Sequence, residues 1–452
     1  MKKIIRIFLT VTVALAVTFA LAISAFADEA ALYTGTLGFN SSKENTNSAK
    51  ISYGLDVVAC DNEITFAGIS GYPLNLSADK IACAMNLSKI DTVEITSLPD
   101  SGEGTIYLGS LAVTSGQIIS EGGISLLSFE SAKGIAKDKP AKFKMKVNGG
   151  AYEINCAIYM LDKINSSPTL AGVPAISLTL ETYRGVCAGG VLCGYDPEGD
   201  ELTYEIVTYP KNGYITLKNK HSGEYIYTPS GEYSGKDEFV YVVKDKYGNY
   251  SEASKVNVTV STPYSNIVYN DLLGDGDYSY AINMTDKNVM NGEKVGDYYY
   301  FRPNAEVSRV DFIVSAMKVL GIENIPSVDT TVFEDDADIG GEVKGYISLA
   351  YSNKYISGTE EGGKLYFKPN ESITMSEAAV IISNIIGYSS NSTAPTFANS
   401  DEIPVWSKDA VMSLRSLGII EAPANAEFEN ISVDRSCMAK LLSRAVWVTE
   451  NM

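Results

Sequence analysis

A segment of about thirty residues occurs twice in this chain, between residues 292 and 321 and again, 66 positions later, between residues 358 and 387. Among the residues of the first copy that meet an identical residue in the second are Gly292, Gly296, Tyr300, Phe301, Pro303, Asn304 and Gly321. One period kept across a helix and two turns indicates stacked copies of a single small unit. Such a unit cannot bury its apolar face alone, so we predict that neighbouring copies complete a shared core.

Each copy carries the same local signals in the same order. A first helix ends near a glycine, the sequence Tyr-Phe-x-Pro-Asn follows, and a second helix begins at Ser308 or Thr374. The residues at 308–311 and 374–377 have the S/T-x-x-D/E pattern, in which a hydroxyl and an acid satisfy the free N–H groups of a helix start. Apolar residues then recur at helical spacing, and further helical patterns lie at 410–417 and 437–446.

These motifs resemble the S-layer homology (SLH) module of exported bacterial proteins, which occurs three at a time. A third copy then spans residues 397–448, with Phe428 and the sequence Ile-Ser-Val-Asp at 431–434. The resemblance implies an all-α-type anchor with modules at 263–323, 324–390 and 391–452, the last degenerate. It also implies a pseudo-threefold arrangement with sugar-binding grooves between the modules, and an anionic secondary cell-wall polysaccharide as partner.

By the same resemblance, Arg309 in the helix-start motif is the expected anion contact. Ser308, Gly292 and Gly358 are the other expected polysaccharide-binding residues. A guanidinium beside a helix N-terminus can hold a carboxylate through two hydrogen bonds. The alternative is a surface salt bridge between Arg309 and an acid such as Glu306.

The other two copies depart from the family pattern. Met375 stands in place of the arginine in the second copy, and the alignment puts Val433 there in the third, which also has Ala422 at the turn glycine. We therefore expect the Arg309 groove to be the competent one. Residues 265–452 contain 14 basic and 27 acidic residues, so attraction to an anionic polymer has to be local.

Residues 166–262 predict a β-sandwich. Short alternating strands at 202–207, 224–228, 238–243 and 255–260 are separated by turns rich in Asn and Gly. The acidic turn at 196–200 followed by Leu-Thr-Tyr-Glu-Ile resembles bacterial Ig-like and cadherin-like tandem domains. Residues 28–165 also read as strands and turns, apart from a short helix expected after Ser77.

A weaker internal repeat links the two β regions. Segments 93–99, 104–108 and 143–147 lie in the same order as 204–210, 213–217 and 239–243, with similar residues in each pair. Two related sandwiches in tandem account for this order. The predicted fold class is therefore multidomain, with all-β sandwiches followed by the three-module helical anchor.

The acidic turn at 196–200 is a candidate metal site. Asp196, Glu198 and Asp200 cluster in one turn, with Asp237 and Asp245 on later turns, and such hard oxygen ligands suit calcium. The alternative is an acidic turn shaped by its proline and glycine. Apart from this possible calcium, no cofactor is expected.

The six cysteines indicate no disulfide scaffold and, with a single histidine and no C-x-x-C, no cysteine-histidine zinc site. Cys187 and Cys193 either pair or are separate buried thiols.

The first 27 residues predict a secretory signal: a basic start, an apolar stretch at 7–23 and a cleavage site at Ala25-Phe26-Ala27. An uncleaved membrane anchor is the alternative. No later apolar run approaches ~20 residues, so we expect a secreted protein at the cell wall or S-layer surface that is not integral to the membrane. The formal charge of −19 argues against nucleic acid as a partner.

These observations predict a non-catalytic protein that is anchored to the wall and displays its β domains. The chain has no G-x-S-x-G, no H-E-x-x-H and no phosphate loop. One alternative is an adhesin or glycan-binding protein whose sandwiches bind a surface glycan or protein. Another is a polysaccharide hydrolase with unrecognised carboxylates in residues 28–165, because paired catalytic acids need not be close in sequence.

Overall fold

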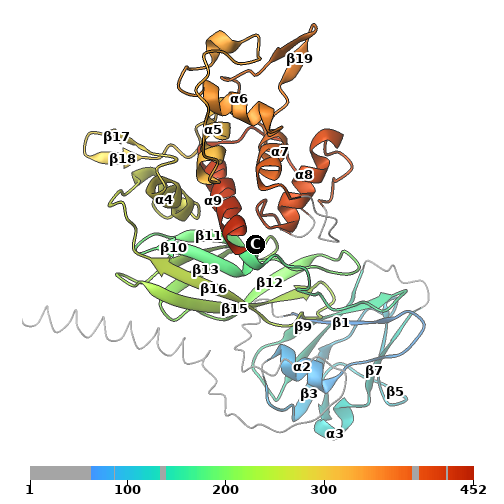
Figure 1. The fold of residues 1–452 in the computed structure, drawn as a ribbon. Helices are drawn as coiled ribbons and strands as arrows, with labels where there is room; N and C mark the ends of the chain where they lie inside the picture. Colours follow the sequence, from blue (N-terminus) through green and yellow to red (C-terminus); the bar gives the residue numbers. More distant parts are fainter. Residues whose placement is uncertain (1–62, 86, 133–138, 389–396, 424–425) are drawn as a thin grey trace, which may run out of the picture. The chain divides into compact units, whose positions relative to one another are not determined.

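The computed structural model describes all residues except 1–62, 86, 133–138, 389–396 and 424–425 (Figure 1). The chain divides into two compact units, at residues 1–164 and 165–452. The expected signal peptide lies outside the described residues. Within the described part of the chain, no helix combines the length and apolar character needed to cross a bilayer.

The first unit is a two-sheet sandwich. One sheet has the strand order β1-β9-β8-β3-β6 and the other β2-β7-β4-β5. Along β8 the side chains of Phe143, Met145 and Val147 point into the core, as strand alternation requires. The elements are β1 (Glu63–Ile69), β2 (Leu74–Asn75), α2 (Ala78–Ala84), β3 (Thr92–Ser97), β4 (Gly104–Leu108), β5 (Leu111–Ala112), β6 (Gln117–Ser120), α3 (Glu121–Ile124), β7 (Leu127–Ser131), β8 (Ala141–Val147) and β9 (Ile154–Leu161).

The second unit begins with another sandwich, whose sheets have the orders β10-β16-β15-β12 and β11-β14-β13. Its core is rich in fully buried tyrosines, including Tyr204, Tyr227 and Tyr241. The predicted strands are confirmed. The elements are a 3-10 helix η1 (Ala175–Leu178), then β10 (Thr179–Tyr183), β11 (Ala188–Val191), β12 (Leu202–Thr208), β13 (Gly213–Asn219), β14 (Glu224–Pro229), β15 (Gly235–Asp245) and β16 (Ser254–Ser261).

Apart from the additional edge strands β5 and β6 of the first sandwich, the two sandwiches order their strands alike, which confirms the predicted tandem repeat. In each, the first strand pairs in parallel with the last: β1 with β9, and β10 with β16. The antiparallel pairs β3–β8 and β12–β15 also correspond, and each shifts register at the same place, between Ile95 and Ser97 and between Ile206 and Thr208. These shifts are bulges, which bend a strand and are kept as designed features.

Helices follow, in pairs. The first two copies have a helix, a two-stranded hairpin and a second helix: α4 (Tyr278–Asp286), β17 (Glu293–Val295), β18 (Tyr298–Tyr300) and α5 (Arg309–Val319), then α6 (Lys344–Ser352), β19 (Thr359–Glu361), β20 (Lys364–Tyr366) and α7 (Met375–Ile386). The third has α8 (Val405–Ser416) and α9 (Arg435–Asn451). Two 3-10 turns, η2 (Asn270–Leu272) and η3 (Asp336–Asp338), precede the first two pairs. Figure 1 shows α4 beside β10 and β11 of the second sandwich, and α9 contacts η1.

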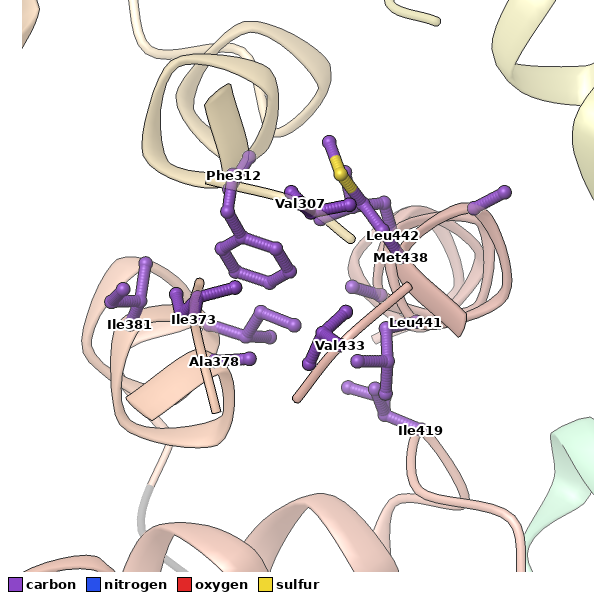
Figure 2. Close-up of a cluster of buried hydrophobic side chains, with 14 of the residues drawn as sticks. Val307, Phe312, Ile373, Ala378, Ile381, Ile419, Val433, Met438, Leu441 and Leu442 are labelled. Carbon is purple, nitrogen blue, oxygen red and sulfur yellow. The ribbon is translucent and has the colours of Figure 1, made fainter. Parts of the chain in front are cut away.

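The three helical copies close into a ring around one axis. The Val307 N–H donates to the Val433 carbonyl at 3.1 Å, the Ile373 N–H to Val307 at 3.0 Å, and the Val433 N–H to Ile373 at 2.8 Å. Figure 2 shows these three side chains meeting beside Phe312 and Ala378 in a buried cluster. That apolar core draws residues from all three copies, so the prediction of a shared core is confirmed.

An aromatic pair opens each copy. The ring centroids lie 5.3 Å apart for Tyr269 and Phe301, and 5.5 Å apart for Phe333 and Phe367. The third copy has the pair Phe397–Phe428 at 5.4 Å. The phenylalanine of the Tyr-Phe-x-Pro motif therefore supplies the second ring in the first two copies, and Phe428 supplies it in the third. Such a pair is worth about 0.5–1.5 kcal/mol beyond its buried area.

Candidate functional site

The second helix of each copy starts with a side-chain cap, and its first helical residue is an arginine in two of the three copies. Ser308 accepts the Asp311 N–H at the start of α5, and Thr374 and Glu377 form a complete capping box at the start of α7. At the start of α9, Asp434 accepts the Cys437 N–H at 2.8 Å. The first helical residues are therefore Arg309, Met375 and Arg435.

The assignment of Val433 to the arginine position is wrong. Val433 is the buried residue before the cap, where Val307 and Ile373 stand in the other copies. The carboxylate of Asp434, not a hydroxyl as in the other two copies, caps this helix, and this shifts the arginine position to residue 435. The pattern of an apolar residue, a cap and an arginine at 433–435 is the signal that would have identified Arg435.

Arg309 is held tightly by the second module. Its side chain is 10% exposed, its Nε donates to the Phe367 carbonyl at 3.0 Å, and its guanidinium lies 5.7 Å from the Phe367 ring centroid. Its Nη1 forms an ion pair with Glu377. The expected alternative partner, Glu306, instead accepts a hydrogen bond from the Ser372 hydroxyl, so Arg309 is not in a surface salt bridge with it.

Arg435 repeats this arrangement against the first module. Its Nε donates to the Phe301 carbonyl at 2.8 Å, its Nη2 to the Asn291 carbonyl at 2.9 Å, and its guanidinium lies 4.6 Å from the Phe301 ring centroid. Partial burial lowers the pKa of Arg435 below its ordinary value. Arg309 and Arg435 thus lie at equivalent junctions between modules. The sequence predicted Arg309 and missed Arg435.

A cavity of about 280 Å³ opens beside Arg309. Its wall includes Lys354 and Gly358 from the second module, Asn384 from α7 and Trp406 from α8, and the Trp406 side chain is 60% exposed. This volume is near the lower end of the ~300–1,000 Å³ typical of small-molecule sites. Arg309 and Lys354 supply positive charge, Asn384 supplies an amide, and Trp406 supplies an open aromatic face. Such a lining suits a ring-shaped ligand that carries a negative charge.

The other predicted binding residues are divided between two places. Gly358 lines the Arg309 cavity and has φ +74°, which a residue with a side chain rarely adopts. Gly292 lies instead beside Asn291, at the Arg435 junction, where a Cβ would come within 2.2 Å of the Tyr269 ring. The Ser308 hydroxyl is used by the helix cap, since it also bonds the Asp311 carboxylate at 2.7 Å.

The predicted calcium residues shape a turn. Asp196 accepts the N–H groups of Glu198 and Asp200 at 3.0 Å each. Glu198 bonds the hydroxyl of Ser166 at 2.8 Å, and Asp200 pairs with Lys246 at 2.9 Å. Within the described residues no three Asp, Glu, His or Cys side chains are arranged to hold a metal ion, and calcium binding at this turn stays a prediction.

Asp237 and Asp245 act in the same way. Asp237 accepts the N–H of Asn212 at 2.8 Å, and Asp245 accepts that of Asn249 at 2.9 Å. Both carboxylates therefore stabilise turns between strands, which is the commonest use of Asp at such positions.

Cys187 and Cys193 are separate thiols. The Cys187 thiol donates to the Asp275 carbonyl at 3.0 Å, and the Cys193 thiol to that of Val191 at 3.6 Å. Burial raises the pKa of Cys193 to about 11, as expected of an inert structural thiol.

Comparison with known proteins identifies the central sandwich. Residues 165–261 match the family model of the bacterial Ig domain. This sandwich is an Ig-like domain. Because the first unit has the same strand pairing, the N-terminal and central regions both contain Ig-like sandwiches. No curated protein matches the chain.

Several solved structures share parts of the chain's fold. Drosophila N-cadherin EC1-3 has 11% identity and a TM-score of 0.20, over 40% of this chain and 56% of that one. The fibronectin(III)-like modules of Clostridium thermocellum CbhA have 11% identity and a TM-score of 0.19, over 44% and 90%. An endo-fucoidan hydrolase of glycoside hydrolase family 107 has 14% identity and a TM-score of 0.17, over 44% of this chain. The chain spans 27% of that hydrolase's length, and likeness of this size carries no functional argument.

Proposed function

We propose that this chain is a secreted, non-catalytic surface protein. Its helical repeats, which resemble SLH modules, bind an anionic secondary cell-wall polysaccharide and thereby display the Ig-like domains outward. The Ig-like domains support a surface or binding protein. The wall attachment is the finer part of the proposal and rests on the helical repeats.

The observation that carries the proposal is the pair of helix-start arginines. Arg309 and Arg435 are each the first residue of a helix, where the helix dipole favours an anion. Each is fixed by a carbonyl and an aromatic ring of the neighbouring module. A guanidinium carries five N–H donors, so it can hold these protein acceptors and still bind a ligand carboxylate.

The acid beside Arg309 supports binding over catalysis. Glu377 is the carboxylate that lines the cavity, and both of its oxygens are engaged. Its Oε2 accepts the N–H and the hydroxyl of Thr374 at 2.9 and 3.0 Å, and its Oε1 holds Arg309. A carboxylate used in this way is poorly suited to exchange protons with a substrate.

Sedimentation with purified cell walls tests the proposal. The purified full-length chain is mixed with native walls and with walls stripped of their secondary polymer, and the variants Arg309→Ala, Arg435→Ala and the double substitution are compared. Arg302→Ala is the matched control, because it removes one arginine from the same repeats at a surface pair with Glu293. Arg309→Lys separates loss of charge from loss of the two-pronged geometry.

We expect sedimentation with native walls alone. Each single substitution should weaken the apparent affinity about tenfold or more, as the loss of a charge-assisted hydrogen bond implies. The double substitution should abolish binding, and the Arg302 control should bind normally. Equal binding to both wall preparations, or full binding by the double variant, would refute wall attachment through these arginines.

An adhesive role for the sandwich is a second candidate, favoured by two exposed tyrosines. Tyr209 and Tyr214 flank the turn between β12 and β13 and are 58% and 70% exposed. Exposed aromatic faces on a rigid turn suit stacking against a sugar ring or contact with a protein. A Tyr209→Ser, Tyr214→Ser double variant that loses binding to a surface glycan, yet keeps binding to walls, would support this role.

A further inference from the structure

The third module contains a counterpart of the cavity beside Arg309. In the turn after α6, the Tyr355 N–H donates to the Ala350 carbonyl at 2.8 Å, and in the turn after α8 the Ile419 N–H donates to Leu414 at 2.8 Å. Both turns therefore leave their helix with the same backbone path. By the threefold arrangement, the turn after α8 faces Met375 as the turn after α6 faces Arg309.

The helix behind each turn confirms this correspondence. Asn384 of α7 donates to the carbonyl of Lys354 at 3.1 Å, and Arg444 of α9 donates to that of Gly418 at 2.7 Å. The two turns thus match residue for residue. This match puts Glu421, three positions after Gly418, on the wall of the third groove.

The third groove differs from the Arg309 cavity on the side formed by the start of the neighbouring module's first helix. Trp406 precedes Ser407, whose hydroxyl bonds the second residue of α7 at 3.2 Å. Gly276 precedes Asp277, whose carboxylate accepts a bond from the second residue of α9 at 2.8 Å. Gly276 therefore occupies the position that Trp406 has in the cavity beside Arg309. The third groove has only glycine backbone where that cavity has an indole ring.

The edge strand of the Ig-like domain fills the space that this backbone leaves. The Gly189 N–H of β11 donates to the Gly276 carbonyl at 2.7 Å, and the Val191 N–H donates to the Glu421 carboxylate at 3.0 Å. A Cβ on Gly189 would lie 2.9 Å from the Gly276 Cα, so the two backbones touch. Between the third turn and the sandwich a cavity of about 40 Å³ remains, enough for a few water molecules.

Charges in this groove suit a closed site. The Glu421 side chain is 2% exposed, and its oxygens lie 2.8 Å from the Lys440 Nζ and 3.2 Å from the Arg444 guanidinium. In the open cavity the corresponding residues are the neutral Ser357, Val380 and Asn384. Buried charges are tolerated only when paired, and here Glu421 occupies the two cations that an anionic polymer would need.

We infer that the third groove is the docking site for the chain's own Ig-like domain. Sandwich and helical repeats then form one rigid body, and two junctions, those headed by Arg309 and Arg435, remain for polymer. The count of two polymer sites rests on the proposed function, whereas the docking itself does not. Because the Ig-like domain, not a polymer, occupies this groove, the repeat's arginine position can hold Met375 and its glycine position can hold Ala422.

Hydrogen exchange of the full-length chain tests the docking without any polymer. We compare peptides covering residues 187–192 and 418–422 in the wild type and in Gly189→Ala, which forces the two backbones apart. Gly276→Ala presents the same clash from the helical side, should the first variant fail to fold. Gly341→Ala is the matched control, since a Cβ there meets nothing within 4 Å.

Both peptides should be protected in the wild type and in the control. They should exchange at least about tenfold faster in Gly189→Ala or Gly276→Ala. Wild-type exchange at Gly189 and Val191 as fast as in an unfolded peptide would overturn the docking. Full protection of the 418–422 peptide in Gly189→Ala and Gly276→Ala would also overturn the docking.

Met375→Arg tests the site count. It restores an arginine at the third junction, so titration with a purified wall-polymer fragment should still give two sites per chain if the sandwich closes the groove. A rise to three sites would show an open groove and refute the inference. A wild type that binds no fragment, but protects both peptides, would refute the proposed function and leave the docking standing.

Discussion

Replacing Glu421 with glutamine should weaken the helical repeats in a manner that depends on pH. Glutamine keeps the shape of the side chain and an acceptor for the Val191 N–H. It removes the charge that compensates Lys440 and Arg444, whose side chains are 27% and 5% exposed. Removing one partner of a buried pair costs about 3–5 kcal/mol, because the remaining charge stays buried without compensation.

The titration of Glu421 gives an independent magnitude. Burial alone would raise the pKa of this carboxyl, but attraction to Arg444 and Lys440 outweighs burial and lowers the pKa from 4.5 to about 2. At 1.36 kcal/mol per pKa unit, this difference corresponds to ~3 kcal/mol of folding free energy. Because the folded pKa is the lower one, the contribution is complete above pH ~4.5 and is lost as the pH falls through about 2.

Urea unfolding followed by tryptophan fluorescence measures this effect in the full-length chain. Both tryptophans, Trp406 and Trp447, belong to the helical repeats, so the signal does not report the N-terminal sandwich. We expect a difference of ~3 kcal/mol in the free energy of unfolding between wild type and Glu421→Gln at pH 6, shrinking towards zero near pH 2. A difference below ~1 kcal/mol at pH 6, or one that does not change with pH, would refute the buried ion cluster.

Three further predictions concern single positions. Thr374→Ala should lower the free energy of unfolding by about 1 kcal/mol, because it removes a helix cap, and an unchanged urea midpoint would contradict this. Gly292→Ala should cost about 1–3 kcal/mol, since its Cβ would lie 2.2 Å from the Tyr269 ring, while Gly341→Ala should be neutral in the same assay. Partial burial raises the pKa of Cys437 to about 12, so at pH 8 iodoacetamide should label it far more slowly in the folded chain than in urea; equal labelling rates by mass spectrometry would contradict this.

Much of the fold could be predicted from the sequence because its signals are local. Strand alternation, the tandem repeat of the β regions and the capping patterns at Ser308 and Thr374 all depend on neighbouring residues. The 66-residue period predicted a shared core, since repeats must bury one another's apolar faces. The ring through Val307, Ile373 and Val433 is the physical form of that core.

The site was predicted less completely, for two physical reasons. The third copy starts its helix with an aspartate cap and has a cysteine, not an acid, three residues later, so its register was misread and Arg435 was missed. The role of Glu421 depends on Val191, 230 residues away in the chain. No periodicity links residues so distant, and an isolated glutamate in a turn predicts exposure, not burial.

The closed ring of backbone hydrogen bonds limits how this gene can change length. The backbones of Val307, Ile373 and Val433 each donate to one neighbour and accept from another, and three members use every donor and acceptor. Unequal recombination readily adds or removes copies in open solenoids, where a new copy meets the same interface as the old ones. Here a fourth copy would find no free partner, and loss of one would leave a gap in the core. A copy that no longer binds ligand is therefore retained for its place in the ring.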